Sequence, residues 1–461
     1  MTFLDQYFNM IMSNFGDFKK IFANIKDYRQ QNLITYPKEI LYLYTLLTFI
    51  FKENNTFDLY FKLLNEQDVI NNFKLLCGDN YITQIPHYNT DRNILLKTNP
   101  NDVYKSLKKL VNNLLRKKTF NKYKFLNKYF LVAIDATQQT YTENQLSDKC
   151  IKMVHNKGTI NERTTYHYYI LSARIVFPNG FTIPLATEFI ENDEKFYNKE
   201  KMKQDCEIKG AYRILKKIKK LFPQQPFCML FDSLYVNEKI FSICNNNKWG
   251  FIVNYKEAKA TSIYNEFNTL KKDNLIFEKN ITFSDEESKT LIKQEIQYTN
   301  MLNYHDISIN IIEVNNISTK LDKQNNEKTE EKYFMYVTNI NIKKDNVFEL
   351  INYGGRQRWK IENQGFNEEK NNGYNLKHLY SKDNEVRKVY YYFMQMGHLL
   401  NNLFENGILN KKEIKKKFKT ILNISKKLSD LFVYKKININ NFEKSNYKFN
   451  NGLKYEILDS T

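Results

Sequence analysis

Two apolar runs, each followed directly by an aspartate, constrain the fold of this chain more than any other feature. The first covers residues 129–134 and precedes Asp135, and the second covers residues 227–231 and precedes Asp232. Because neither run alternates with polar residues, both predict strands that are buried on both faces of a sheet. If the two strands are parallel neighbours, the carboxylates lie side by side and repel unless a proton or a divalent cation joins them.

The elements expected around these runs alternate in the manner of an α/β fold. Pro178, Asn179 and Gly180 predict a hairpin turn, and Pro223 predicts the end of a helix. Strand, hairpin, helix, strand, helix, strand is the order of an RNase H-like fold. After the first run, the expected elements are strands at 166–177 and 181–190, an amphipathic helix at 205–222, a strand at 227–232, a helix at 237–247 and a strand at 250–255.

A third carboxylate, Glu362, lies in the segment from residue 353 to residue 380. A regular helix would place Arg358, Glu362 and Glu369 on one face, at positions i, i+4 and i+11. An amphipathic helix would carry apolar residues on such a face, so a carboxylate there needs a partner or a metal ion. Two aspartates at strand ends and a glutamate on a later helix offer an oxygen-rich site for Mg²⁺ or Mn²⁺.

Three short motifs resemble those of the bacterial insertion-sequence transposases of the Asp-Asp-Glu class. AIDAT at 133–137 is similar to the first-aspartate motif of these enzymes, and FDSLY at 231–235 is similar to the second. Arg358, Trp359 and Glu362 resemble the group of this class that is marked by a Tyr-Arg-Glu-Lys signature. The resemblance covers most of the chain and implies a cut-and-paste DNA transposase with an RNase H-like catalytic core.

The signature matches at its arginine and glutamate but is displaced at its tyrosine and lysine. Gly355 stands where the tyrosine is expected, and the nearest tyrosine is Tyr353. Glu369 stands where the lysine is expected, and Lys370 follows it. One residue turns a regular helix by about 100°, so Lys370 would point away from the glutamate. Either a π-bulge at Gly365 restores the lysine to that face, or the lysine's role is missing or filled elsewhere.

The resemblance implies phosphoryl transfer by two divalent ions, Mg²⁺ or Mn²⁺, roughly 4 Å apart. Asp135 would bridge both ions, Asp232 would hold one and Glu362 the other. Arg358 would neutralise phosphate near the cut, because its planar fork suits phosphate oxygens. Trp359 either packs against the sheet or stacks on a base. The further residues expected to contact DNA are Tyr353, Lys370, Arg356 and Lys256.

The composition agrees with a polyanionic partner, although only in part. The net charge is +19, which favours nucleic acid, but an AT-rich genome would also enrich lysine. The resemblance implies double-stranded DNA as the partner, both the terminal inverted repeats and the target, and a homodimer in the synaptic complex. The longest apolar run, 40–51, is too short to cross a bilayer and predicts a buried helix. We therefore expect no membrane partner and a place in the bacterial cytoplasm, at the nucleoid.

The chain is expected to contain five regions. A helix within the first region is expected to start at Asn101 or Asp102. The stretch 319–332 is expected to be a solvated loop, and an apolar helix is expected at 386–404. The regions are a helical DNA-binding part at 1–120, the first part of the core at 121–255, a β-rich insertion at 256–346, the last part of the core at 347–405 and a helical C-terminal part at 406–461.

Two other functions remain open at this point. The displaced tyrosine and lysine are compatible with a decayed or domesticated transposase that binds DNA without cutting it. An RNase H-like nuclease, active in repair or in resolving DNA, would cut without joining. Metal-dependent cleavage distinguishes the first alternative from a transposase, and strand-transfer products distinguish the second.

Overall fold

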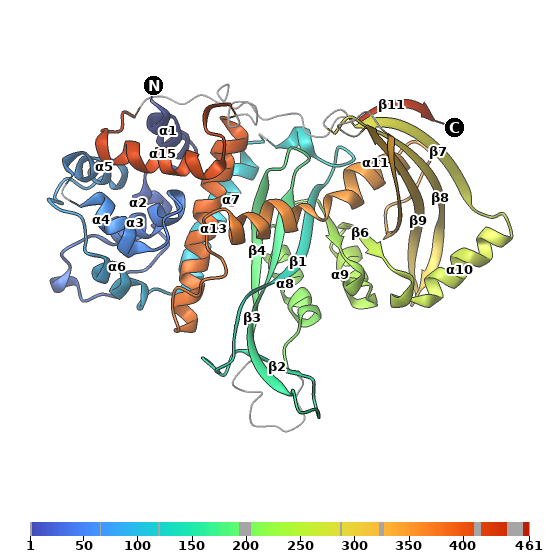
Figure 1. The fold of residues 1–461 in the computed structure, drawn as a ribbon, viewed down its shortest axis with the longest axis horizontal. Helices are drawn as coiled ribbons and strands as arrows, with labels where there is room; N and C mark the ends of the chain where they lie inside the picture. The colour runs from blue at the N-terminus through green and yellow to red at the C-terminus, as the bar shows by residue number, and fades with distance from the viewer. Residues whose placement is uncertain are drawn as a thin grey trace.

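One large mixed sheet runs through the protein (Figure 1). The computed structural model describes residues 2–64, 66–118, 120–192, 204–285, 288–321, 327–409, 416–439 and 455–460. The strands are β1 (Phe130–Thr142), β2 (Ile151–His155), β3 (Arg163–Val176), β4 (Thr182–Ile190), β5 (Phe227–Phe231), β6 (Gly250–Tyr255), β7 (Phe277–Asp285), β8 (Thr290–Tyr304), β9 (Ile307–Leu321), β10 (Glu327–Thr338) and β11 (Tyr455–Ser460). Within the described residues, the strand order is β11-β7-β8-β9-β10-β6-β5-β1-β3-β2, and β4 also pairs with β3. The predicted α/β class is confirmed.

The two apolar runs form the parallel centre of the sheet, as their composition predicts. β1 pairs in parallel with β5, and β5 pairs in parallel with β6. The last pair of β1 and β5 joins Ala133 to Leu230. All five residues of β5 are buried, which explains the absence of polar alternation. Asp135 and Asp232 each follow that last pair by two residues, so the two aspartates lie at the same edge of the sheet.

The predicted hairpin is formed by β3 and β4, which pair antiparallel. Gly180 lies in its turn with a φ of +86°, a conformation that glycine adopts without strain. β1 and β3 extend together past the edge of the sheet and carry β2, a strand that the sequence does not predict. Figure 1 shows this extension at the bottom of the view.

Helices cover the two faces of the central strands. α8 (Glu207–Leu221) and α9 (Glu238–Asn246) confirm the helices predicted on either side of β5. Gly210 of α8 packs near Leu171, whereas Gly365 packs near Arg174. Because Leu171 and Arg174 are three residues apart on β3, they point to opposite faces. α8 therefore covers one face and the segment that carries Glu362 covers the other.

The β-rich insertion continues the central sheet. β10 pairs antiparallel with β6, and β7 to β10 follow one another as antiparallel neighbours. A helix that the sequence does not predict, α10 (Thr261–Lys272), precedes these strands. Figure 1 shows the strands curving away at the right of the view. The insertion is thus fixed to the centre of the sheet by hydrogen bonds along β6.

The prediction of a solvated loop at 319–332 is wrong. β9 continues to Leu321 and β10 begins at Glu327, with Lys320 opposite Lys328. The first seven residues of β10 are all exposed, so polar side chains occur at every position and no apolar period marks the strand. Residues 322–326 lie outside the described part of the chain.

The predicted helical N-terminal region is confirmed, and it packs with α13 (Asn384–Gly407) and α15 (Ile421–Tyr434) (Figure 1). α13 covers the predicted apolar helix at 386–404 and contacts both the helical region and β4. α7 starts after Asn99 rather than at Asn101 or Asp102, because the Asn99 side chain accepts the hydrogen bond of the Asn101 amide. The helices are α1 (Phe3–Phe15), α2 (Phe18–Ile21), α3 (Lys38–Ile50), α4 (Thr56–Leu63), α5 (Gln67–Cys77), α6 (Tyr88–Leu95) and α7 (Pro100–Arg116).

The C-terminal region is helical only in part. α15 fits the prediction, but β11 is a strand that pairs with β7 at the far edge of the sheet. The predicted helical region also includes 410–415 and 440–454, which lie outside the described residues. No helix in the described ranges is both long and apolar enough to cross a membrane.

Candidate active site

Backbone amides hold both aspartates. Asp232 directly follows β5 as predicted, whereas Asp135 lies inside β1, which continues to Thr142 as a partner of β3. The Ala136 amide donates to Asp135 Oδ1 at 2.9 Å. Asp232 begins a 3₁₀ turn and accepts from the Leu234 amide at 2.8 Å. For Asp232 this is the common turn-capping role of aspartate. One oxygen of each carboxylate is left for other partners. β1 and β5 thus place the two acids, and the amides of Ala136 and Leu234 orient them.

The segment that carries Glu362 is a series of short helical turns and not a regular helix. A π-helical turn covers the region of Gly365, where a π-bulge was one of two expectations. π turns contain one more residue per turn than α-helical turns and shift every later side chain around the axis. The turns are α11 (Val347–Glu349), a π turn (Leu350–Gly354), a 3₁₀ turn (Gly355–Gln357), a second π turn (Ile361–Asn367) and α12 (Glu368–Asn371).

The displaced signature tyrosine has a steric cause. The ring of Tyr336 on β10 lies against Gly355, and a Cβ at Gly355 would overlap that ring. Tyr336 is itself buried, so no larger side chain fits at position 355. Tyr353 packs against the rings of Phe348 and Tyr455, with ring centroids 6.2 Å and 5.3 Å away. The structure therefore does not bring Tyr353 to the carboxylates.

Arg358 joins the third carboxylate to the first. Its Nη1 donates to Asp135 Oδ2 at 3.4 Å, and its Nη2 donates to Glu362 Oε1 at 2.8 Å. The side chains of Arg358 and Asp135 are each 16% exposed, whereas that of Glu362 is 51% exposed. Three of the predicted site residues are thus assembled at one edge of the sheet, with the arginine between two acids.

Burial and neighbouring charges disfavour the ionised form of Asp135. Burial raises the pKa of Asp135 to about 7, Arg358 opposes this rise, and Glu362, Glu207 and Asp232 add to it. A carboxyl group that is desolvated among other carboxylates favours its neutral form. A cation bound among these acids would remove the repulsion, so the electrostatics of the site favour a bound cation.

Glu207 is a fourth acid near these carboxylates, and it is not among the predicted site residues. It lies in the first turn of α8, and the Tyr235 hydroxyl donates to its Oε1 at 2.5 Å. Burial raises the pKa of Glu207, and Asp232 raises it further. An acid in a first helical turn is common in any case, so position alone gave no signal. Only the packing of α8 on β3 and β4, which brings Glu207 near Asp135 and Asp232, reveals it.

Glu369 does not share a face with Glu362, contrary to the regular-helix expectation. Its carboxylate is fully buried and accepts hydrogen bonds from Arg174, from Gln395 at 2.8 Å and from His398 at 2.9 Å. Burial would raise the pKa of Glu369, but Arg174 and His398 outweigh burial and lower it. The π turn breaks the i, i+11 periodicity and turns Glu369 into the interior.

Lys370 lies within the range of the charge of Asp135. Burial and the charge of Lys377 lower the pKa of Lys370, while the charges of Glu369 and Asp135 act in the opposite direction. That Lys370 serves as the lysine of the signature stays a prediction.

Trp359 and Lys256 lie in exposed positions. The Trp359 side chain is 54% exposed, so the interpretation that packs it against the sheet is wrong and a surface for base stacking remains. Lys256 follows β6 directly and is also exposed. Because β6 and β5 are parallel neighbours, Lys256 lies at the same edge of the sheet as Asp232.

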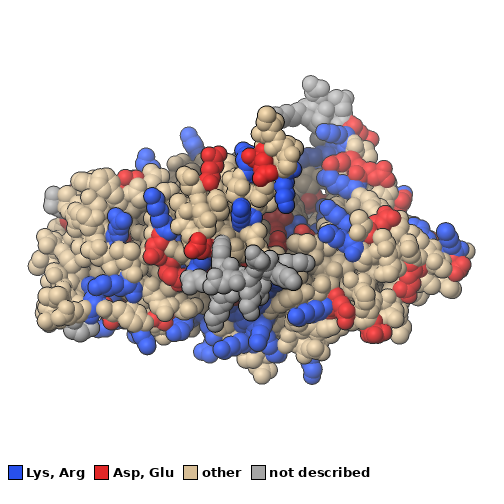
Figure 2. Space-filling view, turned by 90° about the horizontal axis from the view of Figure 1, so that it is seen from below, with Lys and Arg blue, Asp and Glu red and all other residues tan. Residues whose placement is uncertain are grey.

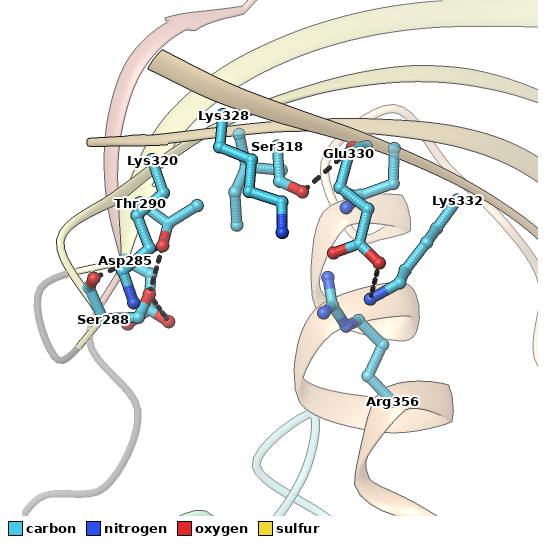
Figure 3. A pocket seen from close by; sticks show the side chains of 11 residues that line it. Asp285, Ser288, Thr290, Ser318, Lys320, Lys328, Glu330, Lys332 and Arg356 are labelled. Atoms are coloured by element: carbon cyan, nitrogen blue, oxygen red, sulfur yellow. Dashed lines mark hydrogen bonds and ion pairs between the residues drawn. The ribbon is translucent and has the colours of Figure 1, made fainter. Parts of the chain in front are cut away.

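Arg356 lines a groove on the concave side of the insertion (Figure 3). The groove has a volume of about 580 Å³ and carries four basic side chains against two acidic ones. Lys332 pairs with Glu330 at 2.9 Å, and the Arg356 guanidinium lies 5.9 Å from the centre of the Phe334 ring. The charged residues that line it are Lys320, Lys328, Lys332, Arg356, Asp285 and Glu330.

The opposite face of the insertion has the opposite charge. A hollow of about 680 Å³ there carries four glutamates and one lysine. Successive residues of a strand point to opposite faces, so Glu330 and Lys332 border the basic groove while Glu331 borders the acidic hollow. Elsewhere the charges mix: Figure 2 shows Lys and Arg side chains spread over the whole of the face seen from below, with acidic ones among them. The groove of Arg356 is therefore a local concentration of positive charge.

The acids of the site match Mg²⁺ or Mn²⁺ in kind, because all their donors are carboxylate oxygens. Within the described residues, no three His, Cys, Asp or Glu side chains are grouped closely enough to hold a metal ion. Asp135 and Glu362 are instead joined through Arg358. Metal binding therefore requires the guanidinium of Arg358 to leave its present position.

Comparison with known proteins adds no family to this description. No protein-family model matches the chain, and no curated protein matches it.

Proposed function

We propose that this protein is a metal-dependent DNA transposase with an RNase H-like core, which cuts the ends of an insertion sequence and joins them to target DNA. The observation that carries the proposal is the link that Arg358 makes between acids from distant parts of the chain. Asp135 and Asp232 lie just beyond the parallel pairing of β1 with β5, and Arg358 ties Glu362 to Asp135. The order of strands and helices around them supports the RNase H-like assignment.

Asp135, Asp232 and Glu362 are the residues that would hold two divalent ions, Mg²⁺ or Mn²⁺. When bound, such ions activate an attacking water or 3′ hydroxyl and stabilise the leaving oxygen. The protein's own cations would bind the DNA: Arg358 and Lys370 lie near Asp135 and suit a phosphate close to the cut. No covalent intermediate with a protein nucleophile is required.

DNA beyond the cut would follow the positive charge of the insertion. Arg356, which lines the groove, belongs to the segment that carries Glu362. The lysines of the groove offer contacts to phosphates (Figure 3). Trp359, which is exposed, suits stacking on a base. The terminal inverted repeats and the target are the proposed DNA partners, and joining two ends calls for a homodimer.

A DNA-binding relic of a transposase is the second candidate, and the position of Tyr353 favours it. That tyrosine packs on Phe348 and Tyr455, away from the carboxylates. A relic would keep the basic groove and lose the cutting. The presence of all three acids favours the active enzyme.

The test is cleavage of a labelled duplex that carries the DNA flanking the gene, in Mg²⁺. We expect the wild-type protein to nick and form hairpins, and the Glu362→Ala variant to bind the same DNA without cutting it. Glu238→Ala is the matched control, because Glu238 is an exposed acid in the first turn of α9. Binding without cleavage by the wild type, in Mg²⁺ and in Mn²⁺, would contradict the proposal and support the relic.

A further inference from the structure

Arg358 stands where a cation shared by Asp135 and Glu362 would bind. Its two terminal nitrogens reach one oxygen of each acid, at 3.4 Å and 2.8 Å. A guanidinium that spans two carboxylates neutralises them with charge-assisted hydrogen bonds. The positive charge that these acids need is therefore supplied by the chain itself.

A divalent ion and the guanidinium cannot both use these oxygens. Mg²⁺ and Mn²⁺ bind carboxylate oxygens at about 2.0–2.2 Å, which would place the ion and the guanidinium within a few ångströms of each other. Like charges at such a separation repel strongly in a half-buried site. Binding of the ion therefore requires Arg358 to swing away.

The surroundings allow that movement. The Glu362 side chain is 51% exposed, and that of Arg358 is 16% exposed, so the arginine reaches solvent without unfolding the segment. The Arg358–Glu362 pair, whose carboxylate is half exposed, is weak, and the Arg358–Asp135 contact is long at 3.4 Å. A divalent ion that is held by several carboxylates can displace the arginine.

We propose that Arg358 is the built-in counter-ion of the metal-free site, and that a divalent cation displaces it and frees its guanidinium for a DNA phosphate. The inference rests on the proposed function, because it needs a metal at these acids. It assigns Arg358 two successive partners, the carboxylates before the metal binds and the phosphate afterwards. Phosphate at the site would stabilise the displaced arginine, so DNA and metal would bind with positive coupling.

The test measures metal binding without DNA and without catalysis. Thermal unfolding is followed while Mn²⁺ is raised, and the Mn²⁺ concentration that gives half of the stabilisation is compared between variants. We expect Arg358→Gln to lower that concentration by about three- to tenfold, the range expected from the loss of competing exposed ion pairs. Arg356→Gln removes the same charge two residues away, from the groove, and we expect a change within about twofold.

Two outcomes overturn the inference: a half-saturating Mn²⁺ concentration for Arg358→Gln equal to that of the wild type, or a higher one. If Arg358→Gln does not fold, Arg358→Met replaces it, since methionine keeps an unbranched stem without the charge, and the same downward shift is expected. If Mn²⁺ stabilises neither the wild type nor Asp135→Asn, the proposed function itself fails. If Mn²⁺ stabilises the wild type and not Asp135→Asn, but the half-saturating Mn²⁺ concentration of Arg358→Gln equals that of the wild type, this inference alone fails.

Discussion

Asp135 interacts with the other charged groups of the site. It follows a fully buried strand segment, pairs with Arg358 and feels the charges of Glu362, Glu207 and Asp232. Burial gives it a pKa of about 7, so without a cation it is partly protonated at neutral pH. The acids around Asp135 would therefore strengthen the proposed binding of a cation even where they do not touch it.

At the residue scale, we predict that Glu207→Gln weakens metal binding. Glutamine still accepts the hydrogen bond of the Tyr235 hydroxyl, so the change removes the charge and keeps the packing. We expect the half-saturating Mn²⁺ concentration in thermal unfolding to rise about three- to tenfold, because one fewer negative charge surrounds the ion. Glu238→Gln controls for a first-turn acid outside the site. If Glu207→Gln and the wild type depend on Mn²⁺ identically in thermal unfolding, Glu207 has a structural role only.

Asp91 is a second carboxyl with a raised pKa, and it belongs to the helical region. It is fully buried and accepts a hydrogen bond from the Thr45 hydroxyl at 2.6 Å, while its other oxygen has no hydrogen-bond partner among the described residues. Burial raises the pKa of Asp91 from 3.8 to about 7. At a pH between these two pKa values, Asp91 holds a proton in the folded protein that it has released in the unfolded chain.

We therefore predict that the contribution of Asp91 to the free energy of unfolding falls as pH rises from about 4 to 7. The fall is up to about 4 kcal/mol, and the contribution is constant above that range. Asp91→Asn keeps an acceptor for Thr45 and removes the buried charge. Thermal unfolding at pH 5 and pH 8 is the measurement, and the variant is expected to melt above the wild type at pH 8, with a smaller difference at pH 5. A difference that is the same at both pH values would show that Asp91 does not titrate in this window.

At the scale of the elements, buried side chains hold in place the turn that follows Glu362. Glu369, at the start of α12, is buried against Arg174 of β3 and His398 of α13. Burial would lower the pKa of His398, but Glu368 and Glu369 raise it. One network thus fixes the π turn to a strand and to a helix, and with it the orientation of Lys370.

We predict that Glu369→Gln destabilises the protein by about 3–5 kcal/mol, because it leaves Arg174 buried without its carboxylate. The free energy of unfolding from denaturant titration measures this loss. Glu368→Gln is the control, since the Glu368 side chain is 21% exposed and pairs only with His398 in the same network. Equal losses for the two variants would show that burial of the Arg174–Glu369 pair is not what anchors the turn.

The elements that the sequence predicts well are those whose residues are uniformly buried or regularly alternating. β5 and β6 are continuous apolar runs, and α8 has an apolar face at helical spacing, so their bounds were predicted to within two residues. The outer part of the β9–β10 hairpin, at 319–332, was predicted as a loop because both of its faces are polar there. Glu207 was missed because its role depends on which strands α8 lies beside.

At the scale of the whole molecule, the site lies at the junction of three parts. The parallel strands supply two aspartates, the segment before α13 supplies Glu362 and Arg358, and the insertion supplies the groove of Arg356 (Figures 1 and 3). Because β10 pairs with β6, the insertion is fixed to the strand that neighbours Asp232. The continuous sheet therefore sets the position of the basic groove relative to the acids.

The central claim, that Asp135, Asp232 and Glu362 hold a divalent ion, is tested most directly by replacing Mg²⁺ with Fe²⁺. Hydroxyl radicals generated at bound iron cut the backbone close to the ion, and the fragments locate the site. We predict cuts near residues 135, 232 and 362 in the wild type, and their loss in Asp135→Asn. Cuts confined to other parts of the chain, or none above the level without iron, would contradict the account.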